Sequence, residues 1–255
     1  MYLLSGLCKY GVSAKRLFSG FEPSPCVSPV FSVVYNAGMD EILVTSAQMK
    51  ELDRRTIEGH GMPSLVLMER AALAAVGTLR DEGFDLSRTV CFCGPGNNGG
   101  DGIAVARLLH LAGHDAAVCF VGDPGKRSEE TRRQQEIAES YGVRFVLPGD
   151  SSIPTETTIP TTVIDAVFGI GGGRAPEGGF LEAIWMMNAA RDAGARVLAL
   201  DIPSGVSADT GEAAGEAVRA DVTVTFAYKK TGLARPPGIG LSGKVVVADI
   251  GIYED

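Results

Sequence analysis

Hydrophobic residues recur along the chain in two patterns: short continuous runs, and longer stretches with helical spacing. The run TVCFC at 89–93 is apolar and partly β-branched, which is typical of a strand buried on both faces. Similar runs predict strands at 116–122, 143–146, 162–168, 196–201, 221–227 and 244–249. Helical spacing predicts helices at about 63–82, 102–113, 128–142 and 180–194. The spacing of Thr45 and Gln48 fits a capping box, which predicts one more helix directly after Thr45.

Strands and helices therefore alternate along most of the chain. This alternation favours parallel strand pairing with helices packed on both faces of the sheet. The prediction is an α/β fold with a single Rossmann-like, doubly wound, mostly parallel sheet. Because no internal linker separates the predicted elements, we expect residues 39–255 to form one domain.

Residues 1–38 differ from the rest, with six serines, three prolines and one acid, Glu22. Their three cations against one acid give a net charge of +2. One interpretation is a mitochondrial-type targeting peptide, which is rich in serine and poor in acids. The other is a disordered extension upstream of a start at Met39. We therefore expect a disordered or targeting N-terminal extension over 1–38.

Composition excludes several classes of protein. Hydrophobic residues make up 45% and charged residues 21% of the chain, which is the profile of a packed globular protein. No run reaches the roughly 18 apolar residues that a membrane helix needs. The net charge of −8 disfavours nucleic-acid binding, because it repels phosphate backbones. Five cysteines, an odd number, indicate no disulfide framework, and Cys91 and Cys93 fit core packing on one side of a strand.

Three loops rich in glycine and small polar residues directly follow predicted strands. In an open parallel sheet such loops meet at the carboxyl edge, where ligands bind. They are GPGNNGGDG at 94–102, GIGGGR at 169–174 and DIPSG at 201–205. We expect the three to form one site.

The first loop also satisfies G-x-G-x-x-G through Gly94, Gly96 and Gly99, the fingerprint of dinucleotide binding. Asp101, however, lies where the following helix begins, and its carboxylate already uses the positive end of that helix. It would repel a diphosphate there. A conventional NAD(P)-dependent oxidoreductase is therefore disfavoured.

The whole set of motifs resembles the NAD(P)H-hydrate epimerase family. The matching segments are LMERA at 67–71, GPGNNGGDG at 94–102, DAVFGIGGGR at 165–174, DIPSGVSADTG at 201–211, VTVTFAYKKTGL at 222–233 and RPPG at 235–238. The resemblance covers 39 to about 252. It implies an isomerase of nicotinamide nucleotide repair, which interconverts the R and S forms of NADH or NADPH hydrated at ring C6 (NADHX and NADPHX). It further implies a functional partnership with a nucleotide-dependent NAD(P)H-hydrate dehydratase, and a homodimer.

The same resemblance implies the site residues. The substrate is expected to contact Asn97, Asn98, Gly99, Gly100, Asp101, Gly169, Ile170, Gly171, Gly172, Gly173, Arg174 and Asp201. One potassium ion per subunit is expected at Asn98, Asp165 and Ser204, whose oxygen donors suit an alkali or alkaline-earth cation better than zinc. Asp201 is the expected catalytic acid or base, because inversion at C6 requires proton movement at the hydroxyl oxygen.

The competing function is a non-catalytic binding or scaffold protein on the same fold. Loss of the acid or of the cation ligands would favour it, but Asp201, Asp165, Asn98 and Ser204 are all present. We expect a cytoplasmic location, or a mitochondrial one if residues 1–38 are a transit peptide.

Overall fold

The computed structural model describes residues 42–146, 160–173 and 175–254. The two predictions for residues 1–38 lie outside this range, as does Arg174. Seven strands form one sheet in the order β4-β3-β2-β5-β6-β7-β9, and every neighbouring pair is parallel. Their bounds are Arg144–Val146 (β4), Ala116–Phe120 (β3), Thr89–Cys93 (β2), Thr162–Ala166 (β5), Arg196–Leu200 (β6), Val222–Phe226 (β7) and Lys244–Ala248 (β9). The predicted parallel sheet is confirmed.

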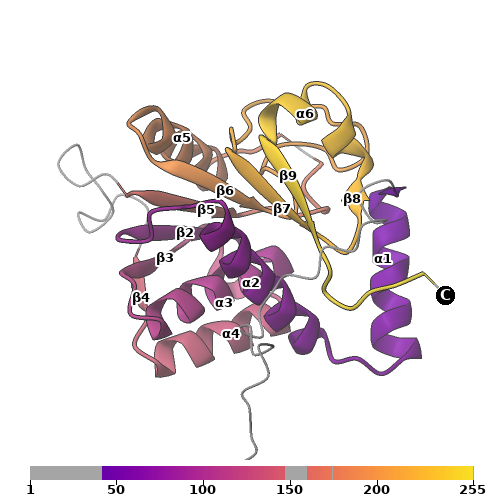
Figure 1. Cartoon of the computed structure of the whole chain (residues 1–255), viewed down its shortest axis with the longest axis horizontal. Helices are drawn as coiled ribbons and strands as arrows, with labels where there is room; N and C mark the ends of the chain where they lie inside the picture. Colours follow the sequence, from indigo (N-terminus) through magenta and orange to yellow (C-terminus); the bar gives the residue numbers. More distant parts are fainter. Residues whose placement is uncertain (1–41, 147–159, 174, 255) are drawn as a thin grey trace, which may run out of the picture. The chain divides into compact units, whose positions relative to one another are not determined.

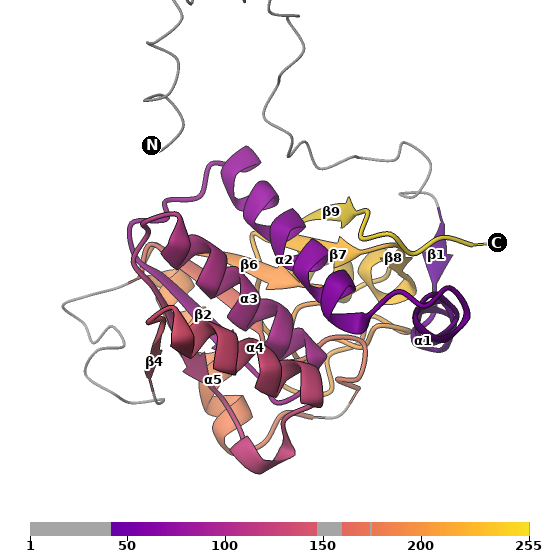
Figure 2. The same ribbon diagram turned by 90° about the horizontal axis from the view of Figure 1, so that it is seen from below.

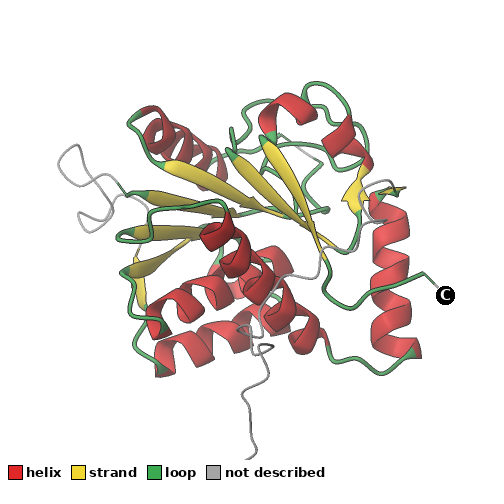
Figure 3. Cartoon of the chain, in the orientation of Figure 1, coloured by secondary structure: helices red, strands yellow, loops and turns green. Residues whose placement is uncertain are grey.

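Helices cover both faces of this sheet (Figures 1 and 3). One face packs against α2 (Ser64–Asp81) and α3 (Asn97–Leu111), with α4 (Glu129–Ser140) beside α3. The other face packs against α5 (Gly179–Asp192). Figure 2, which views the molecule from below, shows α2, α3 and α4 next to one another on the face of the sheet that they cover.

Alternation along the strands divides the core between the two faces. In β2, Cys91 and Cys93 pack with the α2 and α3 side, whereas Val90 and Phe92 pack with the α5 side. Burial raises the pKa of the Cys93 thiol well above its usual range, so the thiol stays protonated. The prediction that both cysteines serve the core is confirmed.

Residues 43–59 form an N-terminal arm beside the sheet, and this arm contains the predicted capped helix. β1 (Leu43–Val44) pairs in parallel with β8 (Lys229–Lys230), and α1 (Ser46–Arg54) follows. Thr45 and Gln48 form the capping box at the start of α1. A single π-helical turn, Arg55–Gly59, then leads toward α2.

The remaining elements are short. They are 3₁₀ turns at Pro124–Lys126 and Thr231–Ala234 and the helix α6 at Gly238–Leu241. No helix in the described ranges combines the length and the apolar character needed to cross a bilayer.

Candidate active site

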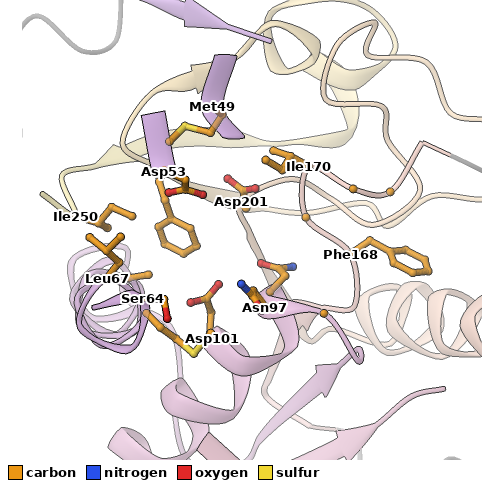
Figure 4. A pocket seen from close by; sticks show the side chains of 18 of the residues that line it. Met49, Asp53, Ser64, Leu67, Asn97, Asp101, Phe168, Ile170, Asp201 and Ile250 are labelled. Atoms are coloured by element: carbon orange, nitrogen blue, oxygen red, sulfur yellow. The ribbon is translucent and has the colours of Figure 1, made fainter. Parts of the chain in front are cut away.

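The three glycine-rich segments meet at one edge of the sheet, as predicted. They follow β2, β5 and β6, which are consecutive neighbours in the sheet and run parallel. Their carboxyl ends therefore lie at the same edge. A cavity of about 390 Å³ opens there, and all three segments contribute to its lining (Figure 4).

The first segment is mostly helical, which corrects the predicted loop over 94–102. Helix α3 begins at Asn97, five residues before the expected start at Gly102. Glycines are poor helix formers, so the sequence pattern favours a loop. The helix needs glycine here because its backbone packs too closely against its neighbours to leave room for a side chain. A Cβ on Gly99 would lie 1.8 Å from the carbonyl oxygen of Gly94, and one on Gly102 would lie 2.8 Å from the Cys93 sulfur.

The predicted substrate residues of this segment divide into two groups. Asn97, Asn98 and Asp101 line the cavity. Gly99 and Gly100 are buried away from it, and a Cβ on Gly100 would lie 2.6 Å from the Met68 side chain. The two glycines thus let α3 approach its neighbours, while the three polar residues face the cavity.

The side chain of Asn98 is a buried polar group without a partner. Both Oδ1 and Nδ2 are inaccessible and have no hydrogen-bond partner among the described residues. An unpaired buried amide costs free energy, about 1–3 kcal/mol for each group left unsatisfied. Such an arrangement is typical of a side chain that awaits a ligand or an ion.

The second segment forms another wall. Gly169, Ile170, Gly171 and Gly172 line the cavity, together with Phe168. Gly173 instead lines a neighbouring cavity beside Gly205 and Ser207.

Asp165 and Ser204 are fully buried, are not among the residues that line the cavity, and are bonded directly to each other. The Ser204 hydroxyl donates to Asp165 Oδ1 at 2.6 Å, and the Ser204 backbone N–H donates to Oδ2 at 2.7 Å. The Ser204 hydroxyl oxygen also accepts from the Phe168 N–H at 2.9 Å. Burial raises the pKa of Asp165 to about 6, although the bonds from Ser204 oppose that rise. The pair therefore ties the second segment to the third.

Asp201 follows β6 in a left-handed backbone conformation, with φ of 68°. Its N–H donates to the Val224 carbonyl at 2.7 Å, which holds the residue against β7. Left-handed φ is uncommon for residues other than glycine and marks a locally constrained position. The Asp201 carboxylate forms an ion pair with Lys230, whose ammonium also donates to the Phe226 carbonyl at 2.8 Å.

Two more carboxyl groups, Asp53 and Asp101, face the same cavity as Asp201. Desolvation raises the pKa of Asp53 to about 6; the charge of Lys230 opposes this shift and that of Asp201 adds to it. Desolvation also raises the pKa of Asp101 well above its usual range, and the charges of Asp201 and Asp53 add to the effect. Three carboxyl groups beside one ammonium favour protonation of at least one of them.

An apolar wall completes the cavity opposite the polar segments. It comes mainly from α1, the turn after it, α2 and the strand ends, through Met49, Ile57, Leu67, Met68, Ala71, Phe226 and Ile250. Figure 4 shows Met49, Leu67 and Ile250 on this side. An apolar surface next to a few convergent polar groups is the usual form of a small-molecule site.

Sequence reasoning missed Asp53 and gave Lys230 no role. Asp53 stands four residues after Met49, so it shares the buried face of α1. The sequence signal that could have revealed Asp53 is a carboxylate on the apolar face of an amphipathic helix.

The N-terminal arm is fixed over the cavity because Asp209 accepts hydrogen bonds from the Ser46 N–H at 2.6 Å and from the Ser46 hydroxyl at 2.9 Å.

Comparisons with known proteins agree with this architecture. The family model described as YjeF-related protein N-terminus matches residues 64–232. An NAD(P)H-hydrate epimerase of Limosilactobacillus reuteri (strain ATCC 55730 / SD2112) is 45% identical over 221 residues, covering 84% of this chain and 99% of the relative. The NAD(P)H-hydrate epimerase of Oenococcus oeni (strain ATCC BAA-331 / PSU-1) is 43% identical over 217 residues, covering 85% of this chain and 100% of the relative. The crystal structure of yeast ynu0, YNL200c, shares the fold, with a TM-score of 0.65 at 21% identity over 76% of this chain and 83% of that one.

Proposed function

The chain belongs to the YjeF-related N-terminal family, and from this membership we propose that it epimerises hydrated NADH and NADPH, as expected from its motifs. The enzyme is thus an isomerase of nicotinamide nucleotide repair. The observation that supports this function best is the cavity at the carboxyl edge. It combines an apolar wall for a ring with Asp201 and the two asparagines of α3.

The reaction inverts the carbon that bears the hydroxyl, C6 of the nicotinamide ring. Expulsion of water requires a proton on the hydroxyl oxygen and leaves positive charge on the ring nitrogen and C6. A carboxylate placed beside the ring stabilises that charge and can take a proton from the water that returns. Asp201 meets this description, because Lys230 stabilises its ionised form and its backbone is held against β7.

The polar residues around Asp201 orient the substrate. Asn97, Asn98 and Asp101 offer donors and acceptors at the start of α3, and Gly169 to Gly172 leave room for a ligand beside Asp201. A Cβ on Gly169 would lie 3.2 Å from Asp201 Oδ2 and 3.4 Å from the Cβ of Asn98. Glycine at this position therefore keeps space open between the two side chains. Arg174, another expected substrate contact, lies outside the described residues.

A potassium ion is proposed at Asn98, Asp165 and Ser204. The residues fit such an ion, since Asn98 Oδ1 is a buried acceptor without a partner and Asp165 is a desolvated carboxylate. The described residues contain no cluster of three or more His, Cys, Asp or Glu side chains suited to a metal, so amide and hydroxyl oxygens would have to contribute. Potassium accepts such donors. When bound, it would supply positive charge next to the substrate segments and brace them.

The non-catalytic alternative gains no support from the site. A scaffold protein has no need to keep an acid and a cation-binding set together. Here Asp201 and Lys230 form a buried pair, and Asp165 and Ser204 are joined directly. The assembled chemistry favours catalysis.

Several wider aspects are proposals that extend from the family. We propose that the enzyme forms a homodimer, and that a nucleotide-dependent NAD(P)H-hydrate dehydratase consumes the S epimer that it produces. The proposed location is the cytoplasm. A mitochondrial location would follow if residues 1–38 act as a transit peptide.

The decisive experiment uses purified protein and the R epimer of hydrated NADH or NADPH. Conversion to the S epimer is followed by chromatography, with and without potassium, and the spontaneous rate is subtracted. We expect acceleration with both hydrates. No acceleration over the spontaneous rate would overturn the proposed function. Substitution of Asp201 by Asn should remove most of the acceleration while leaving stabilisation of the fold by ligand intact.

A further inference from the structure

Epimerisation at a ring carbon requires chemistry on both faces of the ring. In one epimer the hydroxyl leaves from one face, and in the other epimer it leaves from the opposite face. The group that assists departure from a face must also assist addition to that face in the reverse direction. One fixed carboxyl group beside one face therefore serves only half of the reaction.

The cavity presents carboxyl groups on two sides. Figure 4 shows Asp201 and Asp53 on one side, and Asp101 rising from α3 on the other. Asp201 follows β6, Asp53 lies on α1 and Asp101 lies near the start of α3, so three separate elements position them. Together with Lys230, they are the charged residues that line the cavity within the described part of the chain.

We propose that Asp101 and Asp201 are paired catalytic carboxyl groups, one for each face of the substrate ring, and that Asp53 returns the proton between them. This inference rests on the proposed epimerase function. It adds a catalytic role for Asp101 and a role for a residue outside the glycine-rich segments.

The charges around the cavity favour opposite protonation states for Asp101 and Asp201 at the start of the reaction. Lys230 forms its ion pair with Asp201, which stabilises the carboxylate form of that group. Desolvation, reinforced by the charges of Asp201 and Asp53, raises the pKa of Asp101 well above its usual range, while Lys230 opposes the shift. Asp101 is thus the proton donor and Asp201 the acceptor. Two titratable groups with contrasting environments are the usual arrangement of an acid and a base.

The resulting reaction balances in atoms and charge. Asp101 gives its proton to the C6 hydroxyl on its side, and the C–O bond breaks with its electron pair on the departing water. The lone pair of the ring nitrogen forms the C=N bond of an iminium ion. Water then adds to C6 from the other side, the C=N electron pair returns to nitrogen, and Asp201 takes the proton of the added water. One water leaves, one is added, and one proton moves from Asp101 to Asp201.

A third carboxyl group accounts for the return of that proton. Asp53 interacts electrostatically with both Asp201 and Asp101. Its pKa, raised to about 6 by desolvation, lets it gain and lose a proton near neutral pH. It can accept the proton from Asp201 and pass it, directly or through water in the cavity, to Asp101. The enzyme is then ready for another turnover in the same direction.

The test uses each epimer in water enriched in oxygen-18, with rates corrected for the spontaneous reaction. Conversion of the R epimer by the wild-type enzyme is measured first, because its failure would reject the epimerase function itself. Asp101→Asn and Asp201→Asn should each lower epimerisation by about 100-fold or more. Each variant retains one functional face, so each should exchange the hydroxyl oxygen of one epimer without inversion. The two variants should act on opposite epimers.

Further variants separate catalysis from folding. Asp101→Glu keeps a carboxyl group in the cavity and should recover part of the exchange that Asp101→Asn loses. Asp53→Asn should slow net epimerisation while oxygen exchange continues. Asp115→Asn, at an exposed ion pair with Arg144 outside the cavity, should behave as wild type. Epimerisation by Asp101→Asn at the wild-type rate would overturn the proposal. So would exchange of both epimers at equal rates by either Asn variant, or failure of Asp101→Glu to recover any exchange.

Discussion

The ammonium of Lys230 forms an ion pair with the carboxylate of Asp201, and their side chains are only 1% and 12% exposed. The two residues belong to different parts of the fold, since Asp201 directly follows β6 and Lys230 is the last residue of β8. A pair with so little solvent around it is costly to break. Removal of one partner leaves the other charge buried without compensation.

Lys230→Met should therefore lower both stability and activity. We expect a loss of about 3–5 kcal/mol in the free energy of unfolding at neutral pH, the usual result of breaking a buried pair. Urea unfolding at pH 7 measures the stability, and the chromatographic assay of epimerisation measures the activity. Lys229→Met, at the more exposed neighbouring lysine, is the matched control and should cost much less. Equal losses in the two variants would contradict the role given to the pair.

Asp53→Asn should stabilise the protein at neutral pH. Desolvation raises the pKa of Asp53 from 3.8 to about 6, so the folded state binds this proton more tightly than the unfolded state does. The stability that this proton provides is complete below about pH 4 and is lost as pH rises through about 6. Asn has no charge to bury. The free energy of unfolding of the variant should therefore exceed that of wild type by an amount that grows between pH 4 and pH 6 and stays constant above pH 6. Urea unfolding from pH 4 to above pH 6 measures this difference.

Asp85→Asn provides a control with the opposite sign. Hydrogen bonds from the Ser87 backbone and side chain hold the pKa of Asp85 below its usual range. The stability that it contributes is present above about pH 4 and is lost in more acidic solution. This variant should have a lower free energy of unfolding than wild type at pH 7, and the difference between the two proteins should shrink as the pH falls below about 4. An Asp53→Asn variant that followed the same trend would contradict the assigned environment of Asp53.

Much of the fold was predictable because it follows from local patterns. The run TVCFC predicts β2 with the bounds that the structure has, and the capping box predicts the start of α1. Other strands were predicted slightly too long, as with 116–122 against Ala116–Phe120, because the apolar run continues through Val121 after the strand ends. The pairing of β1 with β8 was not predictable. Each of these strands has two residues, which is too short to show a period.

The site was predictable only where the chain gives a local signal. The glycine-rich segments stand directly after strands, so topology alone places them at one edge. Asp53 and Lys230 are far apart in sequence and belong to no such segment, and only the packing of α1 brings them to the same cavity. The start of α3 was missed because its glycines disfavour a helix in isolation. Contacts such as that between Gly99 and Gly94 override this preference.

Potassium should stabilise the wild-type protein more than sodium at equal ionic strength. An ion that binds only the folded state adds RT ln(1 + [L]/Kd), about 2.7 kcal/mol at a concentration 100 times Kd. Asn98→Ala removes the buried amide oxygen that has no partner among the described residues. We expect this variant to lose the difference between the two salts in thermal unfolding. Ser207→Ala, in the loop that follows Ser204, should keep it. Retention of the full potassium effect in Asn98→Ala would exclude Asn98 as a ligand.

Gly169→Ala should impair catalysis more than stability. The added methyl group would lie 3.2 Å from Asp201 Oδ2, so that carboxylate must shift by a few tenths of an ångström, and 3.4 Å from the Cβ of Asn98, which is ordinary van der Waals contact. A displacement of about 1 Å can lower the rate of a reaction by about 100-fold, so a shift of a few tenths of an ångström should lower it by a smaller factor, on the order of several-fold. The expected result is a several-fold fall in kcat with a change in the unfolding midpoint close to that of Gly240→Ala. A Cβ on Gly240 has no neighbour within 4 Å, which makes that variant a control for the substitution itself. A Gly169→Ala enzyme with wild-type kcat would show that the space between Asp201 and Asn98 does not need to stay open.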